Sequence, residues 1–309
     1  MVDLELDQDS LDEPRFAAIR ARLEAVLQGP ELAARLEAAW AAPTARVVSL
    51  QSHKHTGIRS LEAEAPRVVW FGSPTLTERF CGLQFDIAPT DFFQVNTPAA
   101  ERMLERLAEV VALGPSSTLL DLCCGAGTIG LVLARHVKKV IGVELVRSSV
   151  ENAERNARRE GIANAVFHAG AVERLLPGII YNLSPEDRTD IIAILDPPRA
   201  GVNNSVLKCI RATSTIRRVV YISCEQKALE RDCAGLMKGE TKAYRGEPFE
   251  VTASFGVDLF PHTQHVEMIV VLTRREPTAA DTEANPEDRE PPEESSQVGE
   301  PNTESPTTS

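Results

Sequence analysis

Five continuous apolar runs recur along the middle of the chain and determine its predicted fold. Each run has the length of a strand and shows no regular alternation of polar and apolar residues, which is typical of parallel strands buried on both faces. The runs cover residues 118–123, 140–144, 165–168, 191–196 and 218–223. Helical segments lie between them, so the pattern predicts a βαβ series built around a parallel sheet.

Two further strands are predicted after this series, over residues 249–255 and 266–273, with no full helix between them. This spacing predicts an antiparallel hairpin that closes one edge of the sheet. The predicted fold class is therefore α/β, with a Rossmann-like sheet of seven mostly parallel strands. That strand order is typical of methyltransferases.

The first third of the chain has a different pattern. Apolar residues at helical spacing predict two short helices within residues 14–40, with a break at Gly29-Pro30. Short β-like runs separated by Gly and Pro follow, and they predict a small sheet. Thr97-Pro98 is a favourable N-cap and first-turn pair, so an amphipathic helix is predicted from there to about Gly114-Pro115.

These patterns divide the chain into four predicted segments. The last segment is rich in Pro, Glu, Ser and Thr, so it cannot bury enough apolar surface to offset its ordering entropy. The segments are a helical and partly disordered stretch over 1–44, a β-rich remnant of a central domain over 45–93, a methyltransferase-like domain over 94–275, and a disordered acidic tail over 276–309.

Most of the net charge of −12 is carried by the two ends of the chain. Residues 1–13 contain six acidic and no basic residues, and residues 276–309 contain ten acidic residues and one Arg. Residues 14–275 therefore carry a net charge of +3. A mildly basic central part is compatible with an RNA substrate, which the overall charge would otherwise disfavour.

Cysteine usage and hydropathy limit the expected location of the protein. The six cysteines have no CxxC pairing and no companion histidines, which predicts free thiols in a reducing compartment and no metal site. No apolar run approaches the ~20 residues that cross a bilayer, and the acidic first residues are unlike a transit peptide. The sequence thus predicts a protein of the cytosol or nucleus that does not enter a membrane.

A glycine-rich segment between the first buried strand and its helix, Asp121–Gly130, is the predicted cofactor site. Glycines there allow backbone amides to approach a ligand at the helix N-terminus, which predicts an adenosine-bearing cofactor. Glu144 and Asp196 end two other strands on the same edge of the sheet and are predicted cofactor ligands. The carboxylate of Glu144 would accept hydrogen bonds from both ribose hydroxyls.

Two other enzyme classes share parts of this pattern. Gly125, Gly127 and Gly130 match the GxGxxG motif, so a nicotinamide dehydrogenase is an alternative. However, Asp121 gives the D-x-x-x-G-x-G order that is typical of methyltransferases, and a dehydrogenase does not need a second acidic turn at Asp196-Pro-Pro-Arg. That turn resembles the one in amino-group methyltransferases, but Arg199 stands where they have an aromatic residue, which disfavours that class.

The candidate catalytic residues are a cysteine and a base near the same edge. Cys224 follows the fifth buried strand, although a cysteine there is also compatible with a purely structural role. Methylation of uracil C5 requires a thiolate that adds at C6 and a base that removes the C5 proton. The charged segment before the last strand offers Glu267, His262 and His265 as bases, and the residues alone do not distinguish them.

Five ordered segments together closely resemble the RNA uracil-5-methyltransferase family, with its eukaryotic tRNA branch the nearest. They are Phe92–Asn96, Asp121–Gly127, Asp196–Gly201, Ser223-Cys224 and Asp258–Glu267, within a resemblance that spans about Phe80 to Arg275. The resemblance implies a class I fold, S-adenosyl-L-methionine as cofactor and RNA as substrate. Within RNA it implies tRNA, whose T-loop uridine would become 5-methyluridine.

The resemblance also implies a role for individual residues. It makes Cys224 the nucleophile of a covalent adduct at uracil C6 and Glu267 the base. The residues it assigns to the cofactor are Gln94, Cys123, Gly125, Glu144 and Asp196.

Two departures from the family pattern favour an alternative function. The family usually reads Ser-Cys-Asn-Pro at the nucleophile, whereas Glu225-Gln226 follows Cys224 here, and a close carboxylate disfavours a thiolate. Family members also usually carry an RNA-binding domain before the catalytic region, and no such pattern precedes residue 45. The alternative is a catalytically weak member that acts as an RNA-binding or tRNA-folding factor.

Overall fold

A computed structural model of the chain describes residues 2–6, 13–40, 47–54, 67–89 and 91–276. Residues 1–275 group into one unit and residues 276–309 into a second. The disorder predicted for the acidic tail concerns residues that lie almost entirely outside the described ranges, and it stays a prediction.

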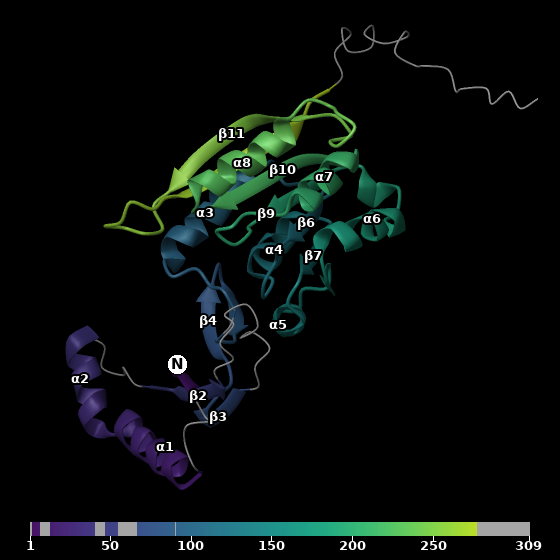
Figure 1. Ribbon diagram of the computed structural model, residues 1–309. Helices are drawn as coiled ribbons and strands as arrows, with labels where there is room; N and C mark the ends of the chain where they lie inside the picture. Colours follow the sequence, from purple (N-terminus) through teal and green to yellow (C-terminus); the bar gives the residue numbers. More distant parts are fainter. Residues whose placement is uncertain (1, 7–12, 41–46, 55–66, 90, 277–309) are drawn as a thin grey trace, which may run out of the picture. The chain divides into compact units, whose positions relative to one another are not determined.

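A seven-stranded sheet forms the centre of the first unit (Figure 1). In spatial order its strands are β11 (Phe249–Val257), β12 (Glu267–Arg274), β10 (Ile216–Ser223), β9 (Ile191–Leu195), β6 (Thr118–Leu122), β7 (Lys139–Glu144) and β8 (Ala165–Ala169). The five strands from β10 to β8 are parallel to one another, while β12 is antiparallel to both of its neighbours. The predicted mostly parallel sheet with an antiparallel edge hairpin is confirmed.

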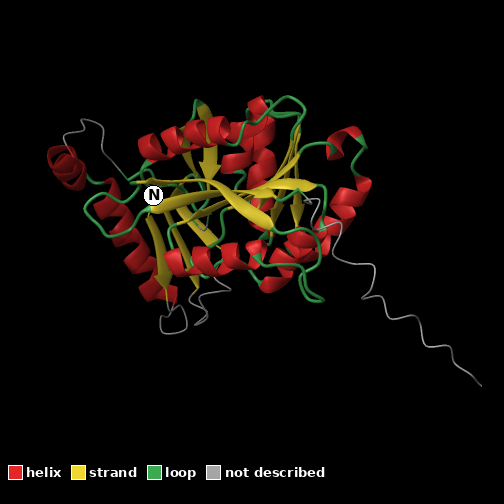
Figure 2. Cartoon of the chain, turned by 90° about the horizontal axis from the view of Figure 1, so that it is seen from above, coloured by secondary structure: helices red, strands yellow, loops and turns green. Residues whose placement is uncertain are grey.

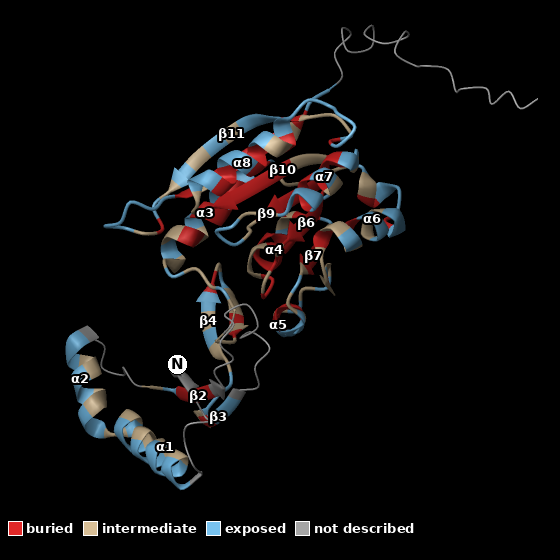
Figure 3. Cartoon of the chain, viewed as in Figure 1, coloured by how far each residue is buried: buried red, intermediate tan, exposed pale blue. Residues whose placement is uncertain are grey.

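Helices cover both faces of this sheet (Figure 2). They are α3 (Thr97–Val110), α4 (Thr128–Leu133), α5 (Arg147–Arg159), α6 (Val172–Asn182), α7 (Asn204–Ala212) and α8 (Gln226–Met237), with short 3-10 turns η3 (Ala134–His136) and η4 (Glu186–Arg188). In β9, Ile192 and Ile194 belong to the core under α3, α4 and α5, whereas Ile191, Ala193 and Leu195 belong to the core under α6, α7 and α8. Burial on both faces explains why the central strands read as unbroken apolar runs (Figure 3).

A β-hairpin before α3 packs into the first of these two cores. It consists of β4 (Leu76–Phe80) and β5 (Leu83–Ile87), which pair antiparallel. Phe80 and Phe85 are buried, and their rings contact each other and Phe93 edge-on or tilted at centroid distances of 5.6–6.4 Å. This aromatic cluster joins the hairpin to the segment that leads into α3.

The first residues of the chain contain two helices and a three-stranded sheet. The helices α1 (Glu13–Gln28) and α2 (Pro30–Trp40) are separated at Gly29, as the sequence predicts. The sheet has the order β1 (Val2–Leu6), β2 (Ser49–Lys54) and β3 (Arg67–Gly72), and β1 is parallel to β2. The strand β1 was not predicted, although Val2, Leu4 and Leu6 alternate with acidic residues in the pattern of a half-buried strand.

A substitution at Gly142 in β7 tests how tightly the sheet packs under α5. A Cβ atom at this position would lie 2.3 Å from Cδ1 of Phe167 and 2.8 Å from Sγ of Cys124. We expect Gly142→Ala to lower the free energy of unfolding by about 1–3 kcal/mol, since overpacked cores must shift side chains or backbone. Urea unfolding followed by circular dichroism measures this change.

Gly178→Ala in α6 is the matched control for this substitution. Nothing lies within 4 Å of a Cβ atom at Gly178, so the alanine there should stabilise the helix by roughly 0.5–1 kcal/mol. Equal effects of the two substitutions would show that the close contacts at Gly142 do not constrain the sheet.

Candidate active site

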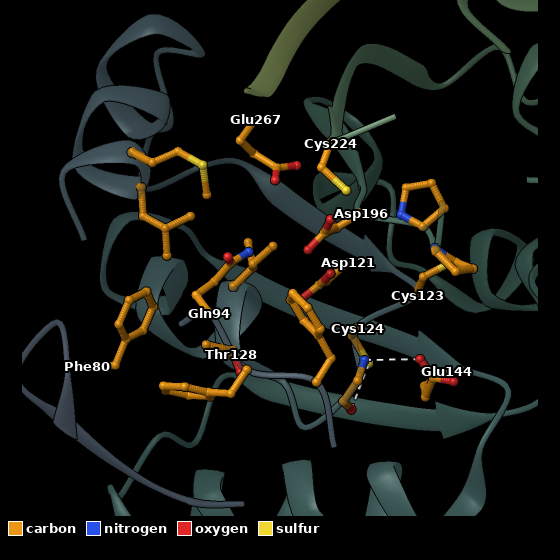
Figure 4. Close-up of a pocket in the computed structure, with 18 of the residues that line it drawn as sticks. Phe80, Gln94, Asp121, Cys123, Cys124, Thr128, Glu144, Asp196, Cys224 and Glu267 are labelled. Carbon is orange, nitrogen blue, oxygen red and sulfur yellow. Dashed lines mark hydrogen bonds between the residues drawn. The ribbon is translucent and has the colours of Figure 1, made fainter. Parts of the chain in front are cut away.

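A pocket of about 610 Å³ opens where the parallel strands end (Figure 4). All seven residues predicted as site residues line it, namely Gln94, Cys123, Gly125, Glu144, Asp196, Cys224 and Glu267. Gln94 precedes α3, Glu267 begins β12, and the others end or follow parallel strands. Because the carboxyl ends of parallel strands meet at one edge, residues far apart in the sequence come together there.

The glycine-rich turn after β6 and the end of β7 form one wall of the pocket. Cys123, Gly125 and Gly127 have φ angles of 75°, 53° and 81°, in the left-handed region that glycine tolerates best. The amide of Gly125 donates to Oε2 of Glu144 at 3.0 Å, and the amide of Val146 donates to Oε1 at 2.9 Å. These two bonds fix the carboxylate of Glu144, and each of its oxygens keeps a lone pair for a further donor.

Three further carboxyl groups face the same pocket, and burial changes their acidity. Burial raises the pKa of Glu267 to about 7, and burial followed by the charge of Glu267 raises the pKa of Asp196 to about 7. Burial and the charges of Asp196 and Glu144 raise the pKa of Asp121 to about 7, despite a hydrogen bond from the Gly130 amide. Within the described residues, Oδ1 of Asp121 has no hydrogen-bond partner. The pocket therefore suits a cation, which would stabilise the ionised carboxylates.

Strand pairing places the predicted nucleophile and base side by side. Ser223 pairs with Met268 in the antiparallel register of β10 and β12, so Cys224 and Glu267 are neighbours across the end of this pair. Both residues line the pocket, and their side chains are drawn near Asp196 in Figure 4. A reacting group bound between them can contact a thiol on one side and a carboxyl group on the other.

The structure separates Glu267 from the other two candidate bases. Glu267 is only 4% exposed and lines the pocket, whereas His262 and His265 are exposed in the loop before β12 and are not among its lining residues. A base must come within hydrogen-bond reach of the proton that it removes. The geometry therefore favours Glu267 over both histidines.

Cys123 brings a second thiol to the same pocket. Burial and the charges of Glu144, Asp121 and Asp196 raise the pKa of the Cys123 thiol to about 12. Since the thiolate is the reactive form of cysteine, Cys123 stays unreactive at neutral pH. Cys224 lies farther from the acidic end of β7 and is the better candidate nucleophile.

The turn that carries Cys224 is held by its neighbours in the sequence. Oγ of Ser223 accepts from the amide of Glu225 at 3.0 Å and donates to the Glu225 carbonyl at 3.1 Å. Glu225 is the N-cap of α8, and its carboxylate accepts from the amide of Lys227 at 3.3 Å. Glu225 thus supplies the capping acceptor that an asparagine would supply in the family pattern, but it adds a negative charge beside Cys224.

A buried aspartate in α8 holds the turn that follows Asp196. Oδ2 of Asp232 accepts from the Val202 amide at 2.9 Å and from the Tyr221 hydroxyl at 2.5 Å. Arg231 binds the other oxygen of Asp232 and also donates to the Ala200 carbonyl. The helix that begins after Cys224 therefore also fixes the loop after Asp196.

Three further lining residues were not singled out individually from the sequence. They are Asp121, Phe92 and Phe260. Asp121 lies inside the predicted cofactor segment 121–130, and Phe92 and Phe260 lie inside two of the segments that carry the family resemblance. Their place in these segments was the available signal.

The described residues contain neither a cluster of metal-binding side chains nor a helix that could span a membrane. Among them, no group of three or more His, Cys, Asp or Glu side chains is arranged to hold a metal ion. None of the described helices has both the length and the apolar character that a membrane span requires.

The sheet order and the pocket at its carboxyl edge define the class I, S-adenosylmethionine-dependent methyltransferase fold. A solved structure of the same fold is that of the Pyrococcus abyssi tRNA (uracil-54, C5)-methyltransferase in complex with S-adenosyl-L-homocysteine. It aligns with a TM-score of 0.56 and 24% identity, over 74% of this chain and 52% of that chain. The predicted fold class is confirmed.

The chain belongs to the tRNA (uracil-5-)-methyltransferase family, whose family model matches residues 81–275. It is 42% identical over 203 residues to the mouse tRNA (uracil-5-)-methyltransferase homolog A, which is 66% of this chain and 33% of the relative. It is 36% identical over 234 residues to the human homolog B, which is 74% of this chain and 45% of the relative. The chain thus spans between a third and a half of the curated relatives that it matches.

The effect of the Glu225 charge on Cys224 can be measured as a change in the reactivity of the Cys224 thiol. The carboxylate opposes a negative charge on the neighbouring sulfur, which the N-terminus of α8 would otherwise favour. We expect Glu225→Gln to increase the rate of Cys224 alkylation by iodoacetamide about threefold to tenfold, as one nearby charge is worth about 1 kcal/mol at a partly exposed site. Mass spectrometry of the tryptic peptide measures this rate.

Glu230→Gln is the control, because it removes an equal charge from the same helix farther from its N-terminus. Its alkylation rate should stay within about twofold of the wild type, since the dipole effect fades within the first turn. Equal rates for Glu225→Gln and the wild type would mean that Glu225 does not oppose the thiolate.

Proposed function

We propose that this protein methylates C5 of a uridine in RNA, with S-adenosyl-L-methionine as the methyl donor. The observation that carries the proposal is the shared pocket of Cys224 and Glu267, which face each other next to Asp196. A thiol and a base on adjacent strand ends are the two groups that chemistry at uracil C5 requires. The family of the chain supports the same reaction.

The pocket fits S-adenosyl-L-methionine by its charge and by the placement of its hydrogen-bond acceptors. Four carboxyl groups line it, from Asp121, Glu144, Asp196 and Glu267, and the cofactor carries a net positive charge. Glu144 offers oriented acceptors for ribose hydroxyls next to the glycine turn. We assign Gln94, Cys123, Gly125 and Asp196 to the same ligand, as lining residues on the surrounding segments.

In the proposed reaction, Cys224 activates the uracil and Glu267 removes its C5 proton. The thiolate of Cys224 forms a bond to C6 of the uracil, and the displaced electron pair makes C5 nucleophilic. The cofactor, when bound, would supply an electrophilic methyl group: C5 would bond to that carbon as the bond from the carbon to the sulfonium sulfur breaks, and S-adenosyl-L-homocysteine would be left. Glu267 then removes the C5 proton, the C5–C6 double bond forms again, and the bond between C6 and the Cys224 sulfur breaks. A pKa of about 7 for Glu267 suits a group that gains a proton near neutral pH.

We infer that the RNA is a tRNA and that the target is its T-loop uridine. The relatives at 36–42% identity are named for tRNA, and the aligned archaeal enzyme is named for uracil-54. A second candidate function is RNA binding or tRNA folding without efficient methylation. The charge of Glu225 beside Cys224 is the observation that favours it.

Methylation of unmodified tRNA with radiolabelled cofactor tests the proposal. We expect the wild type to form 5-methyluridine, Cys224→Ala to form none, and Glu267→Gln to lose about 10²–10⁴-fold in rate, as when a general base is removed. Glu267→Gln should also accumulate a covalent complex with RNA on a denaturing gel, because proton removal precedes release of the thiol.

Binding of S-adenosyl-L-homocysteine by each variant is the control for intact pockets. The covalent complex should vanish in the Cys224→Ala, Glu267→Gln double variant. If the wild type binds both cofactor and tRNA but transfers no methyl group, the second candidate function is the better one.

The raised pKa values predict that cofactor and product affinities differ in their dependence on pH. In the free protein, burial raises the pKa values of Asp121 and Asp196 from 3.8, and that of Glu267 from 4.5, to about 7. The stability that these groups contribute is therefore fully present below about pH 4 and is lost as pH rises to about 7. A bound cation offsets that loss because it favours the ionised carboxylates, while the product, which has no net charge, does so less. The preference for S-adenosyl-L-methionine over S-adenosyl-L-homocysteine should therefore increase about threefold to tenfold from pH 5.5 to 7.

Isothermal titration calorimetry in two buffers of different ionisation enthalpy measures both affinities and the protons released. Proton release should accompany binding of S-adenosyl-L-methionine and be smaller for the product. A preference that stays constant across this pH range would contradict the raised pKa values.

A further inference from the structure

The inward face of α5 contains buried polar residues where packing alone would require apolar ones. Ser149, Asn152 and Asn156 lie one turn apart on this face and are 7%, 3% and 0% exposed. The corresponding face of α3, on the same side of the sheet, consists of Ala, Met and Leu. A buried polar group is costly unless it is hydrogen-bonded, so the partners of these three residues identify what they hold.

The first two residues hold the segment that carries Gln94. The hydroxyl of Ser149 donates to Oδ1 of Asp91 at 3.0 Å, and Nδ2 of Asn152 donates to Oδ2 at 2.5 Å. Asp91 also accepts from the amide of Ala88, so its carboxylate joins Ala88 as well as its own segment to α5. Gln94 follows three residues later and lines the pocket.

Asn156 joins two other segments with a single side-chain amide. Its Oδ1 accepts from the backbone amide of Asp86 in β5 at 2.9 Å, and its Nδ2 donates to the carbonyl of Ala126 at 3.2 Å. Ala126 is the middle residue of the turn from Gly125 to Gly127. The amide of Gly125 in turn donates to Glu144, which lies three residues before α5 begins.

Through these bonds the inward face of α5 contacts the segment that leads to Gln94 and the turn that contains Gly125. Gly125 in turn binds Glu144. Apolar packing is not directional and would leave the turns free to shift relative to the helix. Hydrogen bonds fix both distance and direction, and a ligand site loses affinity when its wall moves by about an ångström. The polar face therefore does more than fill the core beneath the sheet.

We propose that Asn156, supported by Asn152 and Ser149, is a positioning residue that sets the geometry of the cofactor pocket. The inference rests on the proposed function, in which this pocket binds S-adenosyl-L-methionine. Asn156 acts through the Ala126 carbonyl on the glycine turn, while Asn152 and Ser149 act through Asp91 on the segment of Gln94. None of the three lines the pocket itself.

Asn164 provides a control on the same side of the sheet. Its half-buried side-chain amide also donates to two backbone carbonyls, those of Ala134 and Val137, at 2.9 and 3.1 Å. These carbonyls lie at the opposite edge of the sheet, before β7, and not at the carboxyl ends that form the pocket. Asn164→Ala therefore removes a side-chain amide that joins two backbone carbonyls without touching a cofactor segment.

Calorimetric titration of the full chain with S-adenosyl-L-homocysteine compares the two variants. We expect Asn156→Ala to weaken binding about tenfold, since a lost hydrogen bond typically accounts for a threefold to tenfold change. Asn164→Ala should change binding less than about twofold. Both variants should lower the urea midpoint of unfolding by a similar amount. In methylation assays, Asn156→Ala should raise KM for the methyl donor about tenfold, while KM for tRNA and kcat stay within about twofold.

Ser149→Ala is a milder variant that keeps the inference testable if Asn156→Ala fails to fold. It removes one hydroxyl and should weaken binding of S-adenosyl-L-homocysteine about threefold. The inference is overturned if the α5 variants and Asn164→Ala lose affinity in the same proportion to stability, or if the α5 variants lose none. Failure of the wild type to bind the compound is a different result, which overturns the proposed function and the inference with it.

Discussion

The burial of several carboxyl groups in one pocket is the constraint on which the rest of the structure depends. Asp121 lies in β6, Asp196 directly follows the neighbouring strand β9, and Glu267 begins β12. Each has a pKa raised to about 7 because it is removed from water. Such a cluster is unfavourable without a cation, so the surrounding sheet must supply the stability that the pocket lacks. The two apolar cores on either face of the sheet supply it.

The pocket walls are held by directional bonds from helices that do not themselves line it. Asp232 in α8 fixes the turn after Asp196, and the polar face of α5 fixes the turns near Gln94 and Gly125. Both helices begin shortly after a proposed site residue: α8 begins at Gln226, after Cys224, and α5 begins at Arg147, after Glu144. Each thus links the position of one site residue to the loop that carries another, and the pocket is a cooperative unit rather than a set of independent side chains.

The sheet was predictable from the sequence because strands buried on both faces leave an unbroken apolar signal, and glycine at left-handed φ marks the turn after β6. The choice of Glu267 over His262 and His265 was not predictable from spacing, because it depends on the register between β10 and β12. The partners of Asn156 were equally hidden. They lie in β5 and the glycine turn, about 70 and 30 residues earlier, and a single sequence shows no sign of such a pairing.

Glu225 illustrates how one residue can preserve a local structure while changing its electrostatics. As an N-cap its carboxylate accepts from the Lys227 amide at the start of α8, and Oγ of Ser223 accepts from the Glu225 amide in the turn around Cys224. Its carboxylate, however, occupies the end of the helix dipole that would otherwise favour a negative sulfur. Geometry and reactivity at Cys224 are therefore separable. An uncharged acceptor at position 225 can accept the same Lys227 amide, whereas only a carboxylate adds a negative charge beside the sulfur.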